Sequence, residues 1–113
     1  MRMPMEDYTP EEFDRIHNIN QRGVYFLAVA VAKQMFEQGG GVIVNLSSQA
    51  AVDPFPGLDV YGGTKAFINP FPRGLGRDGA PHNIRAFAVA PGAVETAMLR
   101  TAFPDYPAEQ CLD

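Results

Sequence analysis

The chain has 113 residues, enough for one small domain, and its 46% hydrophobic and 19% charged residues are typical of a globular protein. Its net charge of −4 argues against a nucleic-acid partner, and its longest apolar run, Val24 to Ala32, has about half the length that a bilayer-spanning helix needs. The single cysteine, Cys111, excludes an internal disulfide and fits a reducing compartment. We therefore expect a cytoplasmic protein, and from the charge and the short apolar run we expect no nucleic-acid or membrane partner.

A long amphipathic helix is predicted from Thr9 to the glycines at 39–41. Threonine is a good N-cap, Pro10 suits the first helical position, and Glu12 completes a capping box. Apolar residues then recur at steps of three and four over roughly seven turns, at Phe13, Ile16, Val24, Leu27, Val31 and Met35, while Tyr25, Phe26 and Val29 give a second apolar face. We expect one face to pack on a sheet and the other to remain for a partner.

Asn20 interrupts this apolar stripe. An amide that is buried without partners costs about 1–3 kcal/mol, so the side chain must be hydrogen-bonded. A structural asparagine bonded to neighbouring backbone explains its position, and so does a role in the chemistry of a site. The residues alone leave both interpretations open.

The run Val42 to Leu46 predicts a strand buried on both faces, as in a parallel sheet. Ser47 and Ser48 follow at its carboxyl end, which is where ligands bind in open parallel sheets. Residues 49–60 are rich in proline and glycine and predict a loop that closes over a substrate. Its two carboxylates, at positions 53 and 59, are interpreted as solvated loop residues.

Tyr61 and Lys65 are four residues apart on the next predicted helix, so the ammonium can lie near the phenol. A free tyrosine has a pKa near ~10, and a nearby positive charge favours its phenolate form. Such a tyrosine can exchange a proton with a substrate oxygen, which a serine hydroxyl at the neighbouring strand end can hold.

Residues 69–79 predict a break in this second helix. Pro70 and Pro72 would each cost ~3 kcal/mol in a helix interior, and each of the three glycines that follow would cost ~1 kcal/mol relative to alanine. We therefore expect that the helix ends near Ile68 and the chain continues irregularly, or that this copy is impaired.

The same glycines, Gly74, Gly76 and Gly79, satisfy the G-x-G-x-x-G pattern of dinucleotide sites. That pattern requires a strand before it and a helix after it, whereas a predicted strand, Ile84 to Ala90, follows here. We expect no phosphate site at these glycines. The histidines at positions 17 and 82 have no ligand at metal-binding spacing, so no metal site is expected either.

The spacing of Ser48, Tyr61 and Lys65, together with the Val-Asn-Leu-Ser-Ser motif and Pro91-Gly92 after the next strand, resembles the short-chain dehydrogenase/reductase family. The resemblance extends from about Thr9 to Leu99. It implies an α/β fold with a partial Rossmann-type doubly wound parallel sheet, NAD or NADP as cofactor, and interconversion of a small-molecule alcohol and a ketone. Tyr61 is then the general acid or base, Ser48 holds the carbonyl oxygen, and Lys65 assists the tyrosine and binds the ribose.

The resemblance also implies further contacts. Asn20 matches an asparagine that holds a water in the family's proton relay, and the cofactor residues would be Tyr61, Lys65, Pro91, Gly92, Val94 and Thr96. The backbone around Val94 would hold the nicotinamide carboxamide and the Thr96 hydroxyl would reach the cofactor, although a turn after a strand and an N-cap for a helix from Ala97 are equally compatible with these two residues. The two long helices would form the interface of a homodimer or homotetramer.

About two strands and two main helices are predicted, whereas a complete doubly wound fold has about six strands. Residues 1–113 are therefore expected to be one partial NAD(P)-binding domain, the catalytic half without the amino-terminal cofactor-binding half. The alternative is a catalytically inactive truncated remnant that keeps only the helix-pair dimerisation surface. A serine hydrolase using Ser48 is disfavoured, because neither histidine is placed as its base and no G-x-S-x-G motif occurs.

Overall fold

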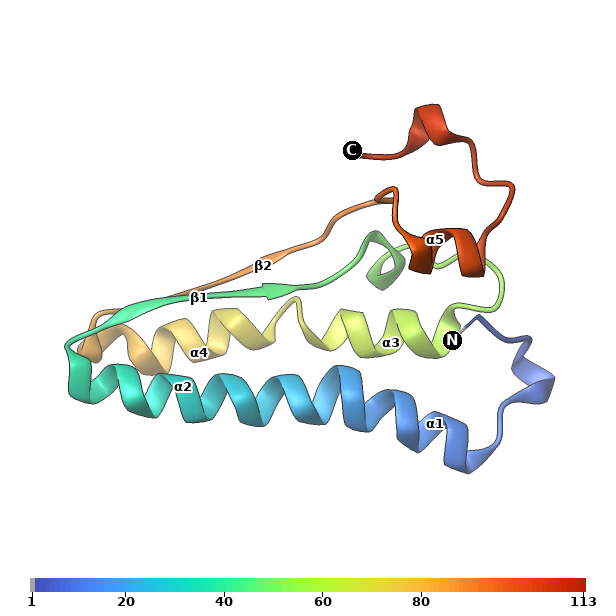
Figure 1. The fold of residues 1–113 in the computed structure, drawn as a ribbon. Helices are drawn as coiled ribbons and strands as arrows, with labels where there is room; N and C mark the ends of the chain where they lie inside the picture. The colour runs from blue at the N-terminus through green and yellow to red at the C-terminus, as the bar shows by residue number, and fades with distance from the viewer. Residues whose placement is uncertain (1) are drawn as a thin grey trace.

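The computed structural model describes residues 2–113 and consists of a small parallel sheet with a layer of helices on one of its faces (Figure 1). The main elements in chain order are α1 Pro10–His17, a π-helical segment Asn18–Gly23, α2 Val24–Gln38, β1 Gly41–Leu46, α3 Asp59–Phe67, α4 Phe71–Gly79, β2 Ile84–Val89 and α5 Ala97–Ala102. Short 3-10 turns lie at Met5–Asp7, Gln49–Ala51, Ala80–His82 and Ala108–Gln110. The predicted α/β class and the two predicted strands are confirmed. No helix of the described residues is long and apolar enough to cross a membrane.

The two strands pair in parallel, in a register that runs from Gly41 opposite Ile84 to Leu46 opposite Val89. Side chains alternate between the two faces of a strand. On the helix side, Ile43 and Ile84 are buried and pack with Ala32 of α2. The opposite face is open, with Val42, Val44, Leu46, Phe87 and Val89 all about half exposed. The prediction that β1 is buried on both faces is therefore wrong for the chain described here.

The predicted long helix exists as α1, the π-helical segment and α2 in one continuous rod (Figure 1). The Thr9 side chain accepts a hydrogen bond from the Glu12 amide at 3.2 Å, as the capping box predicts. The predicted buried stripe is wrong at Leu27, which is 67% exposed while Ala28 and Ala32 are buried, whereas Met35 packs against the core as predicted. A π turn takes up one extra residue, which rotates the residues after it about the helix axis and brings Ala28 rather than Leu27 to the buried face.

Helix α3 ends at Phe67 with Ile68 as its C-cap, as predicted, but the chain after this break is not irregular. It forms α4, for which Pro70 is the N-cap and Pro72 lies in the first turn. Amides in the first turn have no intrahelical partner, so a proline there removes no hydrogen bond. Gly79 is required by packing, since a Cβ at this position would lie 2.8 Å from the Cβ of Ile84. The three glycines 74, 76 and 79 thus lie within a helix that leads into a strand, the reverse of the order in a dinucleotide site.

After β2 the chain crosses above the carboxyl end of the sheet, forms α5 and folds back (Figure 1). Val94 and Leu112 form an isolated parallel bridge, in which the Glu95 amide donates to the Leu112 carbonyl and the Leu112 amide donates to the Ala93 carbonyl. The tail is therefore held against the segment that follows β2, close to the predicted site.

Candidate active site

A pocket of about 620 Å³ opens at the carboxyl ends of both strands. It is bounded by the end of β1, the loop before α3, the first turns of α3, the segment after β2 and helix α5. Seven of the eight residues that the sequence predicts for the site line it: Ser48, Tyr61, Lys65, Pro91, Gly92, Val94 and Thr96. The eighth, Asn20, lies outside the lining. The structure therefore brings together residues that are up to 48 positions apart in the chain (96 − 48).

Tyr61 lies in the first turn of α3, and Lys65 follows one turn later, in the last turn of this short helix. The Lys65 ammonium nitrogen is 5.8 Å from the centroid of the Tyr61 ring and donates a hydrogen bond of 3.0 Å to the Leu46 carbonyl. Burial lowers the pKa of the Lys65 ammonium below its usual value. An ammonium has three protons, so two remain for a ligand once the Leu46 bond is made.

The two serines after β1 have different partners. Ser47 is buried, its hydroxyl donates to the Lys65 carbonyl at 2.9 Å, and its amide donates to the Val89 carbonyl at 2.7 Å. Ser47 therefore fastens α3 to the carboxyl end of the sheet. The Ser48 oxygen accepts a hydrogen bond from the Ala50 amide at 3.1 Å, which leaves its own proton to donate to a ligand.

Asn20 contacts α3 rather than the pocket. Its side-chain amide donates to the Thr64 hydroxyl at 3.3 Å, and that hydroxyl donates to the Tyr61 carbonyl at 2.6 Å. Its partner is thus a side chain, and not the neighbouring backbone that the structural interpretation assumed. Thr64 is fully buried and was not predicted as a site residue. Its position as a polar residue between Tyr61 and Lys65 on the same helix could have identified it.

The approach of α3 to the strand end depends on Gly62, which stands next to Tyr61. A Cβ on this residue would lie only 2.4 Å from the Ala50 carbonyl oxygen. The absence of a side chain lets α3 pack directly on the 3-10 turn that follows Ser48. The glycine thereby sets the distance between the strand end and the helix that carries Tyr61.

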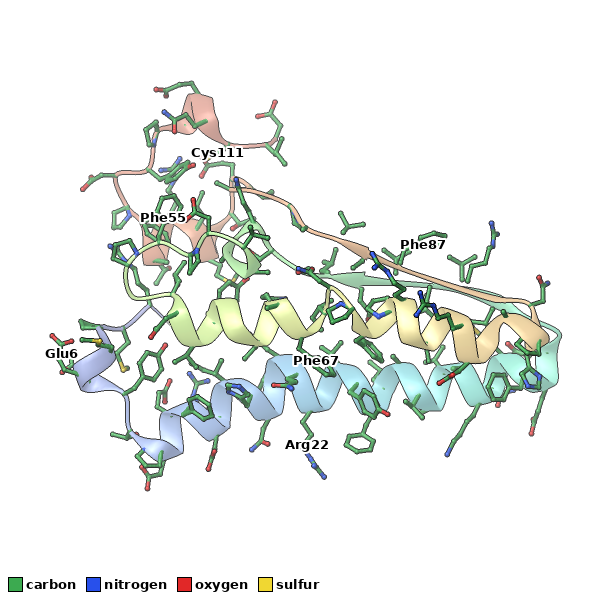
Figure 2. All side chains as sticks on the ribbon, turned by 180° about the vertical axis from the view of Figure 1, so that it is seen from behind. Glu6, Arg22, Phe55, Phe67, Phe87 and Cys111 are labelled. Carbon is green, nitrogen blue, oxygen red and sulfur yellow. The ribbon has the colours of Figure 1, made fainter. Side chains whose placement is uncertain are left out.

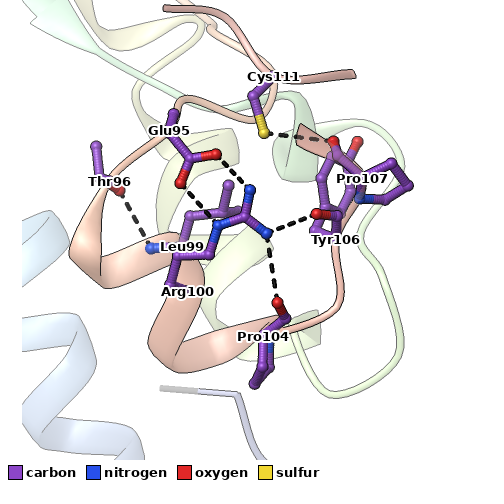
Figure 3. A network of polar contacts seen from close by, with 8 residues as sticks. All are labelled: Glu95, Thr96, Leu99, Arg100, Pro104, Tyr106, Pro107 and Cys111. Carbon is purple, nitrogen blue, oxygen red and sulfur yellow. Dashed lines mark hydrogen bonds and ion pairs between the residues drawn. The ribbon is translucent and has the colours of Figure 1, made fainter. Parts of the chain in front are cut away.

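The segment after β2 forms the opposite wall. The Gln49 amide donates to the Pro91 carbonyl at 3.0 Å, which ties this segment to the end of β1. The bridge to Leu112 uses the Ala93 carbonyl and the Glu95 amide, so the amide and carbonyl of Val94 itself take no part in it. Thr96 caps α5 by accepting a hydrogen bond from the Leu99 amide at 3.1 Å (Figure 3). The N-cap interpretation of Thr96 is confirmed, and its hydroxyl proton is still available to donate.

These groups fit a nucleotide cofactor better than a metal. The pocket presents two ammonium protons of Lys65, the Tyr61 hydroxyl, the backbone of Val94 and the Thr96 hydroxyl proton, a donor set that suits ribose hydroxyls and a carboxamide. Within residues 2–113, no three histidine, cysteine or acidic side chains lie close enough together to hold a metal ion.

A parallel sheet with helices packed on it and a pocket at its carboxyl edge is the architecture of the Rossmann-type α/β class. The family model described as short chain dehydrogenase matches residues 1–107, and the chain belongs to this family. Members of the family use NAD or NADP. The predicted family and fold class are thereby confirmed.

Characterised relatives and solved structures agree with this assignment. The chain is 44% identical over 94 residues to sorbitol-6-phosphate 2-dehydrogenase of Klebsiella pneumoniae, covering 83% of this chain and 34% of the relative. It is 39% identical over 103 residues to carbonyl reductase [NADPH] 2 of Sus scrofa, covering 90% of this chain and 42% of that protein. The chain thus spans less than half the length of these relatives.

Two solved structures show how well the fold matches. A gluconate 5-dehydrogenase from Burkholderia cenocepacia in complex with NADP and tartrate superimposes with a TM-score of 0.86 at 31% identity, over 96% of this chain and 42% of that one. A 3-ketoacyl-(acyl-carrier-protein) reductase from Brucella melitensis complexed with NADH gives a TM-score of 0.84 at 36% identity, over 91% of this chain and 44% of that one.

Proposed function

We propose that this chain is the catalytic half of an NAD(P)-dependent oxidoreductase that interconverts an alcohol and a ketone. The observation that carries the proposal is the lysine ammonium beside a tyrosine ring, 5.8 Å away, in a pocket that the Ser48 side chain also lines. Because the chain spans 34% and 42% of the two relatives described above, the activity of a whole enzyme is part of the proposal.

In ketone reduction, Tyr61 would act as the general acid and donate its hydroxyl proton to the substrate oxygen. The Lys65 ammonium would favour the phenolate that remains, because an opposite charge nearby stabilises the ionised form. Ser48, whose oxygen already accepts from the Ala50 amide, would donate its proton to the same substrate oxygen and hold it in place. When bound, a nicotinamide cofactor supplies or accepts the hydride.

The cofactor residues in this proposal are those that offer donors to the pocket. Lys65 would give its two remaining protons to ribose hydroxyls, and the Val94 backbone would hold the carboxamide. The Thr96 hydroxyl proton would add a further contact, and Pro91 and Gly92 would form the turn beside it. The choice between NAD and NADP belongs to residues of the other half of such an enzyme.

We assign Asn20 to a water-mediated proton relay toward Lys65. Support for this role comes from its bond to Thr64, which lies on the same helix and next to the lysine in sequence. Support also comes from its position in a π-helical segment, because such segments occur frequently at functional sites.

We further propose a homodimer formed by the outer faces of α2 and its neighbouring helices, and a cytoplasmic location. The dimer is supported by three large apolar side chains of α2 that are exposed, Tyr25, Phe26 and Leu27. The location is supported by the single cysteine.

A second candidate function is a non-catalytic remnant that pairs with a longer relative. The open apolar face of the sheet, where Val44 is 55% and Phe87 49% exposed, favours it. Titration of the 113-residue chain with NADH separates the two: a change in cofactor fluorescence with a micromolar Kd supports the enzyme, and no change at millimolar NADH supports the remnant.

The enzyme proposal is tested directly by fusing the amino-terminal half of a family relative to this chain and measuring NADH and NADPH oxidation with ketones. We expect turnover in the fusion and a loss of at least about 100-fold in Tyr61→Phe, the lower end of what general acid catalysis contributes. Tyr8→Phe, at a tyrosine outside the pocket lining, is the matched control and should keep full activity. If Tyr61→Phe retains at least half the rate, the general acid is another group.

A further inference from the structure

Three aromatic rings form one wall of the pocket. Phe55 comes from the loop before α3, and Phe103 and Tyr106 follow α5. The Phe55 ring centroid lies 5.5 Å from that of Phe103 and 6.3 Å from that of Tyr106, and the latter two are 6.5 Å apart. In Figure 2, Phe55 lies between its loop and the chain around α5. Phe55 is 53% exposed, so the residue has surface available for a ligand.

Arg2 holds this aromatic wall together. Its guanidinium donates to the Pro56 carbonyl at 3.3 Å and to the Ala102 carbonyl at 3.0 Å, and it lies 4.3 Å from the centroid of the Phe103 ring. Because Pro56 and Ala102 are the sequence neighbours of Phe55 and Phe103, one side chain joins the two segments that carry these rings. The wall is therefore formed before any ligand binds, which lowers the entropic cost of binding.

Arg2 and Arg100 are hydrogen-bonded to the chain around the pocket, whereas Lys65 keeps two ammonium protons, which the proposed function gives to the cofactor. Arg2 is held by two carbonyls, and Lys65 is the only basic residue in the described chain that lines the pocket. Arg100, nearby on α5, forms an ion pair with Glu95 and also donates to the Tyr106 carbonyl at 2.6 Å (Figure 3). Asp53 is the one acidic residue among the described residues that line the pocket. No arginine of the described chain lines the pocket, and a guanidinium is the group that best recognises a phosphate or carboxylate on a substrate.

We infer that this pocket selects an uncharged ketone or alcohol that carries an aromatic ring, and that the ring packs against Phe55, Phe103 and Tyr106. Aromatic rings attract one another beyond what their buried area contributes when their centroids lie about 4.5–7 Å apart, and the wall offers three such partners. The identity of the reacting group rests on the proposed function, whereas recognition of the ring rests on the wall alone.

The test measures binding, so that it does not depend on turnover. Ligand-observed NMR on the 113-residue chain would give Kd values for 2-acetylnaphthalene, an uncharged aryl ketone, and for fructose 6-phosphate, an anionic ketose. We expect the aryl ketone to bind at least about 10-fold more tightly. Phe55→Ala and Phe103→Ala should each weaken its binding roughly 3- to 10-fold, the factor that corresponds to one aromatic contact. Phe87→Ala, on the open face of the sheet, is the matched control and should change Kd less than twofold.

Two results would overturn the inference. One is tighter or equal binding of fructose 6-phosphate by the unmodified chain, a comparison that stands even if a variant fails to fold. The other is an equal loss in Phe87→Ala and Phe55→Ala, which would mean that the ligand binds the open sheet face. The proposed function can fail while this inference stands: that is the result if the 113-residue chain binds the aryl ketone selectively but the fused enzyme does not turn it over. If the fused enzyme prefers the ketose phosphate, the function stands and the substrate class is wrong.

Discussion

The side-chain amide of Asn20 donates a hydrogen bond of 3.3 Å to the hydroxyl of Thr64, 44 residues later in the chain. This bond joins the π-helical segment to α3. The Thr64 hydroxyl in turn donates a hydrogen bond of 2.6 Å to the Tyr61 carbonyl. The long amino-terminal helix is thereby linked to the turn of α3 that carries both Tyr61 and Lys65.

Replacing Asn20 by alanine should lower the free energy of unfolding by about 0.5–1.5 kcal/mol, the net worth of a typical hydrogen bond. Thr64 would keep its bond to the Tyr61 carbonyl, so the loss should stay within that range. Urea denaturation followed by circular dichroism measures it. Asn69→Ala, at an exposed position in the break between α3 and α4, is the control and should change stability by less than about 0.5 kcal/mol. An equal loss in both variants would mean that the Asn20 bond contributes nothing specific.

Thr64→Val keeps the shape of the side chain and removes the hydroxyl. Both Asn20 and the Tyr61 carbonyl then lose a partner, and we expect a loss of about 1–3 kcal/mol because Thr64 is fully buried. In the double variant Asn20→Ala/Thr64→Val the losses should not add, since the bond between the two residues can be removed only once. Strictly additive values in the same urea experiment would rule out a direct interaction.

The grouping of the site could be predicted because it follows from two general regularities. Ser48 and Pro91 each stand two residues after the end of a parallel strand, and the carboxyl ends of such strands meet at one edge of the sheet. Tyr61 and Lys65 share a helix face because they are four residues apart. Neither inference requires knowledge of how side chains pack.

The parts that could not be predicted depend on one-residue differences in register. The choice between Leu27 and Ala28 as the buried residue is decided by the π turn before α2, and the larger side chain gives the wrong answer. The cost of Pro72 depends on whether it falls in the first turn or the interior of α4, which requires the helix start to within one or two residues. Apolar periodicity and residue propensity do not resolve positions this finely.

Glu95 and Arg100 form an ion pair (Figure 3), so removing the arginine should change the pKa of the Glu95 carboxyl. The guanidinium donates hydrogen bonds to the carboxylate and holds the pKa of Glu95 below its usual value of 4.5. A group whose pKa is lowered on folding stabilises the fold fully above its unfolded pKa, and this stabilisation is lost as the pH falls through the folded value. In Arg100→Gln the pKa of the Glu95 carboxyl should return toward its usual value, as measured by carbon-13 NMR of the side-chain carboxyls.

Glu12 provides the internal control for this titration. Its pKa is also lowered, chiefly by hydrogen bonds from Arg15, which the Arg100→Gln change leaves in place. The Glu12 titration should therefore be the same in both proteins. An unchanged Glu95 titration would mean that Arg100 does not hold the carboxylate in solution. Equal shifts at both carboxyls would instead indicate a general loss of structure.

Two adjacent glycines of α3 should respond in opposite ways to alanine. At Gly62 a Cβ would lie 2.4 Å from the Ala50 carbonyl oxygen, a backbone atom that cannot move without shifting the turn after Ser48, so Gly62→Ala should destabilise the protein by roughly 1–3 kcal/mol. At Gly63 nothing lies within 4 Å of a new Cβ, and alanine in an exposed helical position should stabilise the protein by about 0.5–1 kcal/mol. Urea denaturation of the two variants shows whether contact with Ala50 restricts position 62 to glycine or whether α3 accepts alanine at both positions. If Gly62→Ala is as stable as Gly63→Ala, α3 does not pack on the Gln49–Ala51 turn as closely as the structure indicates, and the distance between Ser48 and Tyr61 is not set by this contact.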